Sequence, residues 1–348
     1  MAKKLIGLGL MLVILGGAAA GAGYWMMYTP NTPDFEGERS VKVPRGASFE
    51  AVVDTLGRQG LLKRPRTFEL IAQATGWGDQ IKAGHYVFEA GTSNYTFLDR
   101  LRKGLQDPIR LTVPPGTRPD VVARVLAKQM TFTPEAFLAA LKDLAFAAEL
   151  GTDTTHLFSY MMPETYFMYW LTDERSVISK IKRTTDDYFN AERRAQAERA
   201  GLTVDEVLSV ASIVEWETSL RDEKPRVAGV YLNRLRDGWK LDADPTVQYA
   251  VLQREGAKRR LFFRDYRIEH PYNTYLRRGL PPGPVTNPSP SSIDGVLNAE
   301  DHGYYFFVAT GDGGHTFSRT LRDHNRAAQA FYRTMRERRR QAAASQTP

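Results

Sequence analysis

The chain of 348 residues contains no cysteine and only six histidines. Without cysteine there are no disulfide bonds, no thiol catalysis and no cysteine-bound metal. The histidines are scattered and none falls in an HExxH spacing, so the sequence predicts neither a catalytic metal nor a cofactor. Hydrophobic residues make up 42% of the chain, which is ordinary for a globular protein with real cores.

Charge is also limited, at a formal net value of +7. Part of it lies in a run near the C-terminus, at Arg333, Arg336, Arg338, Arg339 and Arg340. We interpret residues 333–348 as a basic, solvated and disordered tail, with attraction to an acidic wall polymer or anionic lipid as the alternative. No nucleic-acid-binding motif is present, so nucleic acid is not an expected partner.

The one long hydrophobic run lies at the N-terminus. Lys3 and Lys4 precede an uncharged stretch from Leu5 to about Met27. About 20 apolar residues in a helix cross the ~30 Å hydrocarbon core of a bilayer. Residues 1–28 therefore predict a cytoplasmic tip and a single transmembrane helix, followed by a linker at 29–39.

A cleaved signal peptide is the alternative, because small residues that a peptidase accepts occur at Ala18, Ala19, Ala20 and Ala22. The run exceeds the ~7–15 residues of a signal h-region, and Tyr24, Trp25 and Tyr28 form an aromatic belt at its end. Both facts favour a retained anchor. Two lysines precede the run, and the first basic residue after it is Arg39. The positive-inside rule therefore places the N-terminus in the cytoplasm. In a bacterium, the rest of the chain would then lie in the periplasm.

A weak internal repeat follows the linker. Residues 41–56 read VKVPRGASFEAVVDTL and residues 111–126 read LTVPPGTRPDVVARVL. Each copy predicts a short strand, a Pro- and Gly-containing turn, and an amphipathic helix. With a helix at about 65–75 and a strand at about 85–88, residues 40–105 form a small α/β module. Residues 106–155 form a connecting α/β unit that includes a helix capped by Thr133.

The module at 40–105 resembles LysM-type domains through VPRGASFEAVVDTLGRQGLL and IKAGHYVF. The resemblance implies binding of glycans that contain N-acetylglucosamine. A purely structural packing module is the alternative, because units of strand, turn and helix are common.

The segment Val207–Thr218, VLSVASIVEWET, is an apolar helix that carries two carboxylates, Glu215 and Glu217. A long helix from Glu174 to about Ala200, a stop at Gly201 and a cap at Thr203 precede it. A buried glutamate must be paired, hydrogen-bonded or protonated. Apolar burial raises the pKa of a carboxyl group, and sugar-cleaving enzymes use such a group to protonate the leaving oxygen.

Six motifs in order carry a more specific resemblance: ASIVEWET, DADPTVQY, YNTY, GLPPGPVTNPS, YFFVATGDGGHTFS and DHN. Together with the N-terminal anchor they resemble the membrane-anchored endolytic murein transglycosylases of bacteria (MltG- or YceG-like), as far as about Tyr332. The resemblance implies an α+β protein with a single N-terminal transmembrane helix, a small LysM-like α/β module and a mixed α+β catalytic domain at 156–332.

The family reaction is cleavage of the β-1,4 bond between N-acetylmuramic acid and N-acetylglucosamine inside peptidoglycan strands, without water, to leave a 1,6-anhydro end. The resemblance to the IVExE pattern makes Glu215 the catalytic residue and gives Glu217 a supporting role through a hydrogen bond or a salt bridge. Helical periodicity alone does not decide between them, because residues two apart face roughly opposite sides of a helix.

The resemblance implies further substrate contacts at Asp244, Thr246, Gln248, Tyr272, Asn273, Thr274 and His315. Each has a structural alternative. Asp244 could cap the helix that follows it, residues 272–274 could form a turn, and His315 could fix a loop. His324 and Asn325 are expected to be structural.

One departure from the family pattern lies in LFSYMMPETYFM, where members usually carry a glycine and a Pro-Asp-Thr-Tyr run. Here Ser159 and Tyr160 precede Met161, and Glu164 replaces the aspartate.

The expected partners are peptidoglycan strands, the membrane, and peptidoglycan synthases with division or elongation proteins. A non-catalytic anchored glycan binder and a membrane scaffold are the alternative functions.

Overall fold

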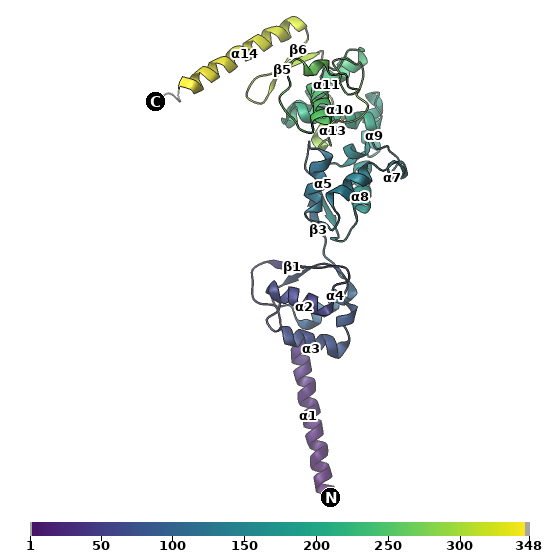
Figure 1. Cartoon of the computed structure of the whole chain (residues 1–348), viewed down its shortest axis with the longest axis vertical. Coiled ribbons are helices and arrows are strands. Elements are labelled where there is room, and N and C mark those ends of the chain that lie inside the picture. Colours follow the sequence, from purple (N-terminus) through teal and green to yellow (C-terminus); the bar gives the residue numbers. More distant parts are fainter. Residues whose placement is uncertain (1, 345–348) are drawn as a thin grey trace. The chain divides into compact units, whose positions relative to one another are not determined.

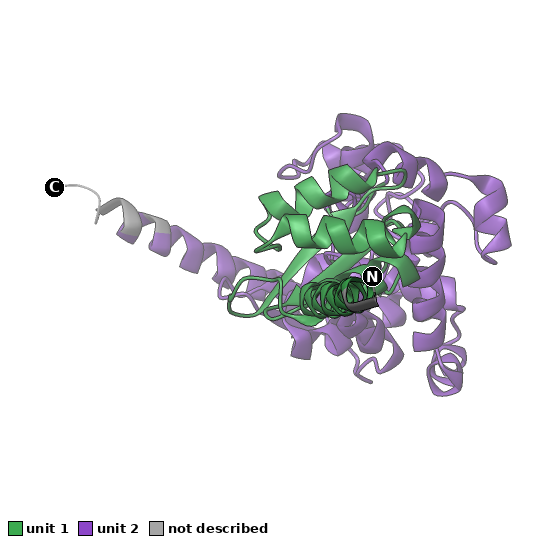
Figure 2. Cartoon of the chain, turned by 90° about the horizontal axis from the view of Figure 1, so that it is seen from below, with its two compact units in different colours: residues 1–111, 129–131, 167–172 green, residues 112–128, 132–166, 173–348 purple. Residues whose placement is uncertain are grey.

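The computed structural model describes residues 2–344, which fall into two compact units (Figure 2). Unit 1 comprises residues 1–111, 129–131 and 167–172, and unit 2 comprises residues 112–128, 132–166 and 173–348. Helices dominate both units, and three two-stranded sheets accompany them (Figure 1). The predicted α+β class is confirmed.

Unit 1 has the element order α1, β1, α2, α3, a 3-10 turn η1, β2 and α4 (Figure 1). The bounds are α1 Ala2–Tyr28, β1 Glu38–Val43, α2 Phe49–Arg58, α3 Pro65–Thr75, η1 Gly78–Gln80, β2 Gly84–Glu89 and α4 Asn94–Lys103. Strand β3 (Ile109–Thr112) pairs with β4 (Thr165–Met168), and the division between the units falls within both strands. The helix and strand predicted at 65–75 and 85–88 are confirmed.

The core of unit 1 lies between its sheet and its helices. β1 and β2 are antiparallel, with Val41 opposite Tyr86 and both side chains buried. Phe68 of α3 and Phe97 of α4 pack edge to face beneath them, with ring centroids 6.0 Å apart. This strand, helix, helix, strand order is the one that the sequence predicted for the module.

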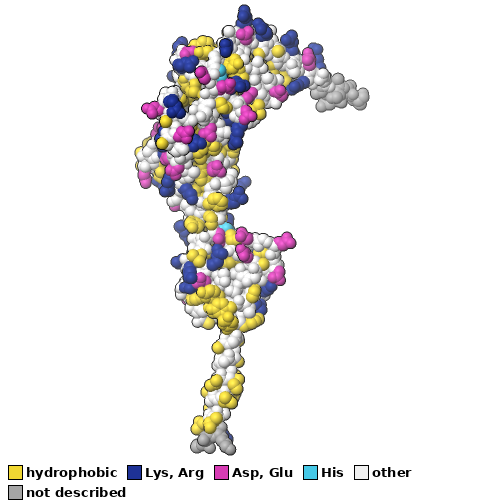
Figure 3. All heavy atoms as spheres, turned by 180° about the vertical axis from the view of Figure 1, so that it is seen from behind, with side chains coloured by type: hydrophobic (Ala, Val, Ile, Leu, Met, Phe, Trp, Pro, Cys, Tyr) yellow, Lys and Arg dark blue, Asp and Glu magenta, His cyan; other side chains and the backbone are white. Residues whose placement is uncertain are grey.

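Helix α1 is apolar, and residues Lys4–Tyr28 are long enough to cross a membrane. Figure 3 shows its exposed surface free of charged side chains over most of its length. Its last turn is part of unit 1, because the amide of the buried Asn94 donates to the carbonyl of Met26 at 2.8 Å. Arg64 lies over the ring of Trp25, 4.5 Å from its centroid. These contacts attach the end of α1 to the fold of unit 1.

Unit 2 is built around α10, whose central residues are all buried. Its elements are α5 Pro119–Ala127, α6 Pro134–Leu141, α7 Leu144–Glu149, η2 Leu157–Tyr160, α8 Glu174–Tyr188, α9 Ala191–Arg199, α10 Val204–Glu217, η3 Arg221–Glu223, α11 Lys224–Arg236, α12 Asp244–Glu255, η4 Asp265–Arg267, α13 Pro290–Leu297, β5 Phe306–Ala309, β6 His315–Ser318 and α14 Leu321–Ala344. Helices α11, α12 and α13 pack directly against α10.

Local capping explains where several of these helices begin. Thr203 and Glu206 form a reciprocal capping box at the start of α10, as the sequence suggested for Thr203, and Thr133 caps α6. The prediction of one helix from Glu174 to Ala200 is wrong. Asn190 accepts a hydrogen bond from the amide of Arg193 at 3.0 Å and starts a new helix there.

Two expected boundaries also differ from the structure. From Thr112 onward, most of the connecting unit belongs to unit 2, so it forms one compact body with the segment that bears the glutamates. The basic tail is helical as far as Ala344, because α14 continues through it, and residues 345–348 lie outside the described residues. The ring of His324 on α14 stacks on Phe306 of β5, in agreement with a structural role.

Candidate active site

A cleft of about 710 Å³ in unit 2 contains both glutamates. Helix α10 ends there and contributes Glu215, Trp216 and Glu217, while α12 contributes Asp244 and Gln248. Helix α10 ends at Glu217, and the residues directly before Glu215 are buried. The two carboxylates therefore lie at the end of the helix, where the cleft opens.

Oxygen Oε2 of Glu215 accepts four hydrogen bonds. The donors are the amide of Ser289 at 3.0 Å, its hydroxyl at 2.5 Å, the hydroxyl of Ser292 at 2.6 Å and the ammonium of Lys224 at 3.2 Å. Oxygen Oε1 accepts none from residues 2–344. One oxygen therefore anchors the carboxyl group, and the other is left for a ligand.

The surroundings of Glu215 favour its ionised form. Ser289 is the N-cap residue of α13, where the helix dipole attracts negative charge, and its hydroxyl is donated to Glu215. Burial raises the pKa of Glu215, but the hydrogen bonds from Ser289 and Ser292 and the charge of Lys224 outweigh it, so the net effect is a lowered pKa. The expected net direction, a raised pKa for this residue, is therefore wrong.

The raised pKa belongs to Glu217. Burial raises the pKa of this carboxyl group to about 7, against the hydrogen bond that Tyr231 donates to it, and the charge of Asp244 adds to the increase. Two carboxyl groups with opposite pKa shifts thus lie two residues apart. Such a pair is typical of sites that carry out acid–base chemistry.

We expect the shift of Glu217 to make stability depend on pH. The folded state retains a proton that the unfolded state releases near its ordinary pKa of 4.5, so the free energy of unfolding should fall as the pH rises from about 5 to 7 and then level off. At ~1.4 kcal/mol per pKa unit, the loss is at most about 3.5 kcal/mol. Denaturant titrations from pH 5 to 8 should show a flatter profile for Glu217→Gln. Equal slopes of the free energy of unfolding against pH for this variant and the wild type would contradict the assignment. Glu192→Gln, at an exposed position, is the control.

A backbone turn closes one side of Glu215. Gly116, in the second copy of the sequence repeat, has a φ of +57°, and a Cβ there would lie 3.4 Å from Cγ of Glu215. The indole Nε1 of Trp216 donates to the carbonyl of Gly116 at 2.8 Å. Asn287 holds the same turn, because its carbonyl accepts from the amide of Gly116 at 3.2 Å. The repeat unit at 111–126 is therefore part of the site.

Lys258 adds a cation to the cleft. Its ammonium lies 3.1 Å from the centroid of the Trp216 ring. Burial lowers the pKa of Lys258 to about 8, and the positive charge of Arg118 contributes to the decrease. Most Lys258 side chains are still protonated and charged at neutral pH. The cleft can thus receive an anionic group beside Glu215.

Of the other predicted residues, Asp244 and Gln248 do line the cleft. Asp244 is the first residue of α12 and does not cap it. Its carboxylate accepts from the hydroxyls of Tyr275 at 2.7 Å and Tyr266 at 3.2 Å. The amide nitrogen of Gln248 is buried and has no hydrogen-bond partner in the described part of the chain, as expected of a group that a ligand would satisfy.

Three predicted contacts lie inside the fold instead, and we withdraw them as substrate contacts. Thr246, Asn273 and Thr274 are each at most 1% exposed. The hydroxyls of Thr246 and Thr274 are 2.9 Å apart and hydrogen-bonded, and the amide of Asn273 donates to the carbonyls of Tyr266 and Ile268. They hold the start of α12 against the 272–274 turn, which was the structural alternative.

Tyr272, His315 and Glu164 lie elsewhere. The Tyr272 ring packs against Tyr249 in a tilted arrangement, with centroids 4.3 Å apart, and lines a second cavity. Both the amide and the Nδ1 of His315 bond Glu223 at 2.8 Å, which fixes the loop that precedes β6. The carboxylate of Glu164 accepts from the amide of Thr165 at 2.9 Å.

Sequence reasoning missed Lys224, Ser289 and Ser292, which supply all the hydrogen bonds to the Glu215 carboxylate within residues 2–344. Ser289 closes the motif GLPPGPVTNPS, so a signal existed for it, but neither charge nor periodicity links Lys224 to Glu215. Their convergence depends on the packing of α10, α11 and α13.

The site defines a class of protein: one that brings two carboxyl groups of opposed pKa to an open cleft, as glycoside-cleaving enzymes do. Residues 41–330 match the YceG-like family, and the chain belongs to that family. It is similar to the endolytic murein transglycosylase of Bacillus subtilis, with 26% identity over 314 residues that cover 86% of each chain.

The chain is also similar to the endolytic murein transglycosylase of Streptococcus pneumoniae D39, with 28% identity over 316 residues. That match covers 82% of this chain but spans only 57% of the relative. Among solved structures, it is similar to a YceG-like protein of Listeria monocytogenes, with a TM-score of 0.58 and 25% identity. The match covers 84% of this chain and 99% of that one.

Proposed function

We propose that this protein is an endolytic lytic transglycosylase of peptidoglycan, a lyase whose catalytic carboxyl group is that of Glu215. The observation that carries the proposal is the arrangement of this carboxylate, which is fixed through Oε2 and has Oε1 free. The names of the curated relatives support the substrate, and the cleft offers further polar groups at Asp244, Gln248 and Lys258.

The reaction needs one carboxyl group that acts twice. Protonated Glu215 gives its proton to O4 of the departing N-acetylglucosamine as the bond from C1 of N-acetylmuramic acid to O4 breaks. The muramoyl 6-hydroxyl oxygen then bonds to C1, and the carboxylate of Glu215 accepts the proton that this hydroxyl loses. The products are a free 4-hydroxyl and a 1,6-anhydro end. Water takes no part, so no second carboxylate at a hydrolase spacing is required.

The starting acid is the less stable form of Glu215, since four donors stabilise its carboxylate. We therefore expect kcat/KM to rise as the pH falls from 7 to 5, by up to about tenfold per pH unit. The test is to incubate the full chain in detergent with uncrosslinked glycan strands and to identify the new ends by mass spectrometry. Ends one water lighter than reducing muramic acid are expected. Reducing ends would mean a hydrolase, and retained binding without cleavage would favour a glycan-binding protein.

The same proposal includes the placement of the protein. Helix α1 anchors it in the cytoplasmic membrane of a bacterium with the N-terminus inside, and unit 2 acts in the periplasm on strands near the membrane. The LysM-like part of unit 1 binds glycan of the same polymer, and peptidoglycan synthases or division and elongation proteins are the neighbours that would supply it. The apolar helix α1 supports the membrane anchor, and the element order of unit 1 supports the LysM-like assignment.

A further inference from the structure

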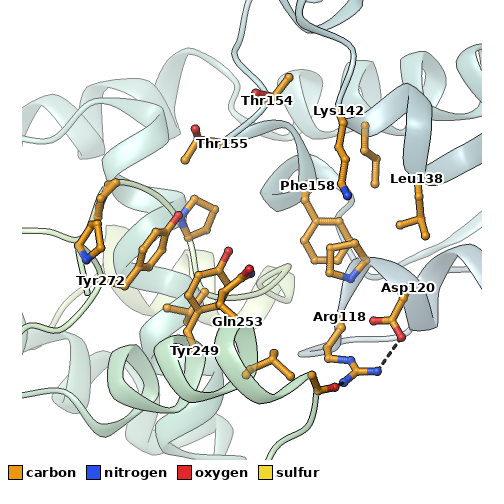
Figure 4. A pocket seen from close by; sticks show the side chains of 18 residues that line it. Arg118, Asp120, Leu138, Lys142, Thr154, Thr155, Phe158, Tyr249, Gln253 and Tyr272 are labelled. Carbon is orange, nitrogen blue, oxygen red and sulfur yellow. Dashed lines mark hydrogen bonds and ion pairs between the residues drawn. The ribbon is translucent and has the colours of Figure 1, made fainter. Parts of the chain in front are cut away.

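A second cavity of about 710 Å³ lies in unit 2, and neither Glu215 nor Glu217 lines it (Figure 4). In Figure 4, Phe158 and Leu138 form one side, and Tyr249 and Tyr272 face them from the other. Several further prolines and aliphatic side chains make the walls mostly apolar. The volume falls within the ~300–1,000 Å³ that is usual for small-ligand sites.

The charge of the cavity is confined to one rim. Arg118 is fixed, because it donates to Asp120 at 2.6 Å and to the carbonyl of Gly256 at 2.7 Å (Figure 4). Lys142 is exposed, and within residues 2–344 no carboxylate lies within ion-pair distance of its ammonium. The site thus combines apolar walls with one positive charge that a ligand carboxylate could pair with.

The cavity and the cleft share a helix. On α12, Gln248 lines the cleft, whereas Tyr249 and Gln253 line the cavity. Gln248 and Gln253 are about 8 Å apart along the helix axis at ~1.5 Å per residue. The segment after α12 also connects them, with Gly256 at the cavity and Lys258 at the cleft. A ligand in the cleft could therefore extend a branch into the cavity.

The lining is poorly suited to a sugar. A saccharide carries a hydroxyl group on most of its carbons, and apolar walls would leave these groups without hydrogen bonds. The peptide attached to each muramoyl residue of peptidoglycan has the matching chemistry, since it carries alanine methyl groups and free carboxylates. Four extended residues span about 13 Å, which is enough to pass from one site to the other.

We propose that this cavity binds the stem peptide of the glycan strand held in the cleft, with a peptide carboxylate paired to Lys142. The inference rests on the proposed function of the cleft. It makes the protein selective for strands that still carry peptides over strands from which the peptides have been removed.

The test compares two substrates, namely glycan strands with tetrapeptide stems and the same strands stripped of peptide by an amidase. The full chain in detergent is assayed as wild type and as Lys142→Glu. For the variant we expect KM to rise about tenfold on peptide-bearing strands, with kcat unchanged, because the charge that pairs with the carboxylate is reversed. KM on stripped strands should not change. Lys128→Glu, an equally exposed charge reversal that lines neither site, is the matched control.

A second variant tests the walls without changing charge. Gln253 is exposed on α12, so Gln253→Trp should fill the cavity without disturbing the core, and it should also raise KM on peptide-bearing strands only. If the wild type and both variants each showed the same KM on both substrates, the inference would be overturned. That result is the one expected if the cavity instead receives a segment of another protein. A rise on both substrates would also overturn it, by assigning the cavity to glycan. Failure of the wild type to cleave either substrate would instead refute the proposed function.

Discussion

Glu215→Gln should lower the turnover number on glycan strands by at least about a thousandfold, because the amide can neither give up a proton to the leaving oxygen nor accept one afterwards. Binding should persist, since the amide oxygen of glutamine can still accept from Ser289 and Ser292. The measurement is the rate of formation of 1,6-anhydro ends, together with co-sedimentation of the variant with insoluble peptidoglycan.

Glu217→Gln is the matched comparison, because it makes the same change two residues away in the same cleft. We expect a smaller loss of about tenfold, since Glu217 acts through Tyr231 and through the electrostatics of the cleft. If Glu217→Gln abolished turnover and Glu215→Gln did not, the two roles would be exchanged. Thermal unfolding of both variants separates loss of chemistry from loss of fold, because Lys224 is only 5% exposed and loses its charged partner in Glu215→Gln.

Much of the fold could be predicted from the sequence where the signal is local. Thr203, Thr133 and the glycine stop at Gly201 gave helix boundaries, because capping and left-handed backbone depend on one or two residues. The break at Asn190 obeys the same rule, but no proline or glycine marks it in the sequence. The apolar run at the N-terminus predicted α1 by length and composition alone.

The electrostatics of the site could not be predicted in this way. Glu215 and Glu217 lie in the same apolar helix, yet their pKa values shift in opposite directions. The difference comes from residues distant in sequence, since Ser289 meets Glu215 across 74 positions. Thr246 illustrates the same limit, because its motif placed it at the cleft while its hydroxyl turns inward to Thr274. A motif identifies the residues of a site but not the direction in which each side chain points.

Asn287→Ala should cause a large loss of stability, about 3 kcal/mol in the free energy of unfolding. Asn287 is 0% exposed. Its amide donates to the carbonyls of Pro114 at 3.0 Å and Met161 at 2.9 Å, and its side-chain oxygen accepts from the amide of Thr117 at 3.1 Å. Alanine would leave the carbonyl of Met161 without a partner in the interior, and the carbonyl of Pro114 and the amide of Thr117 without partners where they are partly buried. Denaturant unfolding of the full chain in detergent measures the effect.

The same substitution should also lower kcat, because the Asn287 side chain bonds Pro114 and Thr117 on either side of Gly116, which closes one side of Glu215. Asn298→Ala is the matched control. Asn298 is exposed at the end of α13, where its side chain bonds Gln196 at 2.7 Å and the carbonyl of Asp294 at 3.0 Å, so we expect a change within about 0.5 kcal/mol and unaltered kcat. Equal losses of stability in the two variants would show that the buried network around Asn287 does not hold the turn. A loss of stability in Asn287→Ala with kcat unchanged would show that the turn at Gly116 supports the fold but not the chemistry of Glu215.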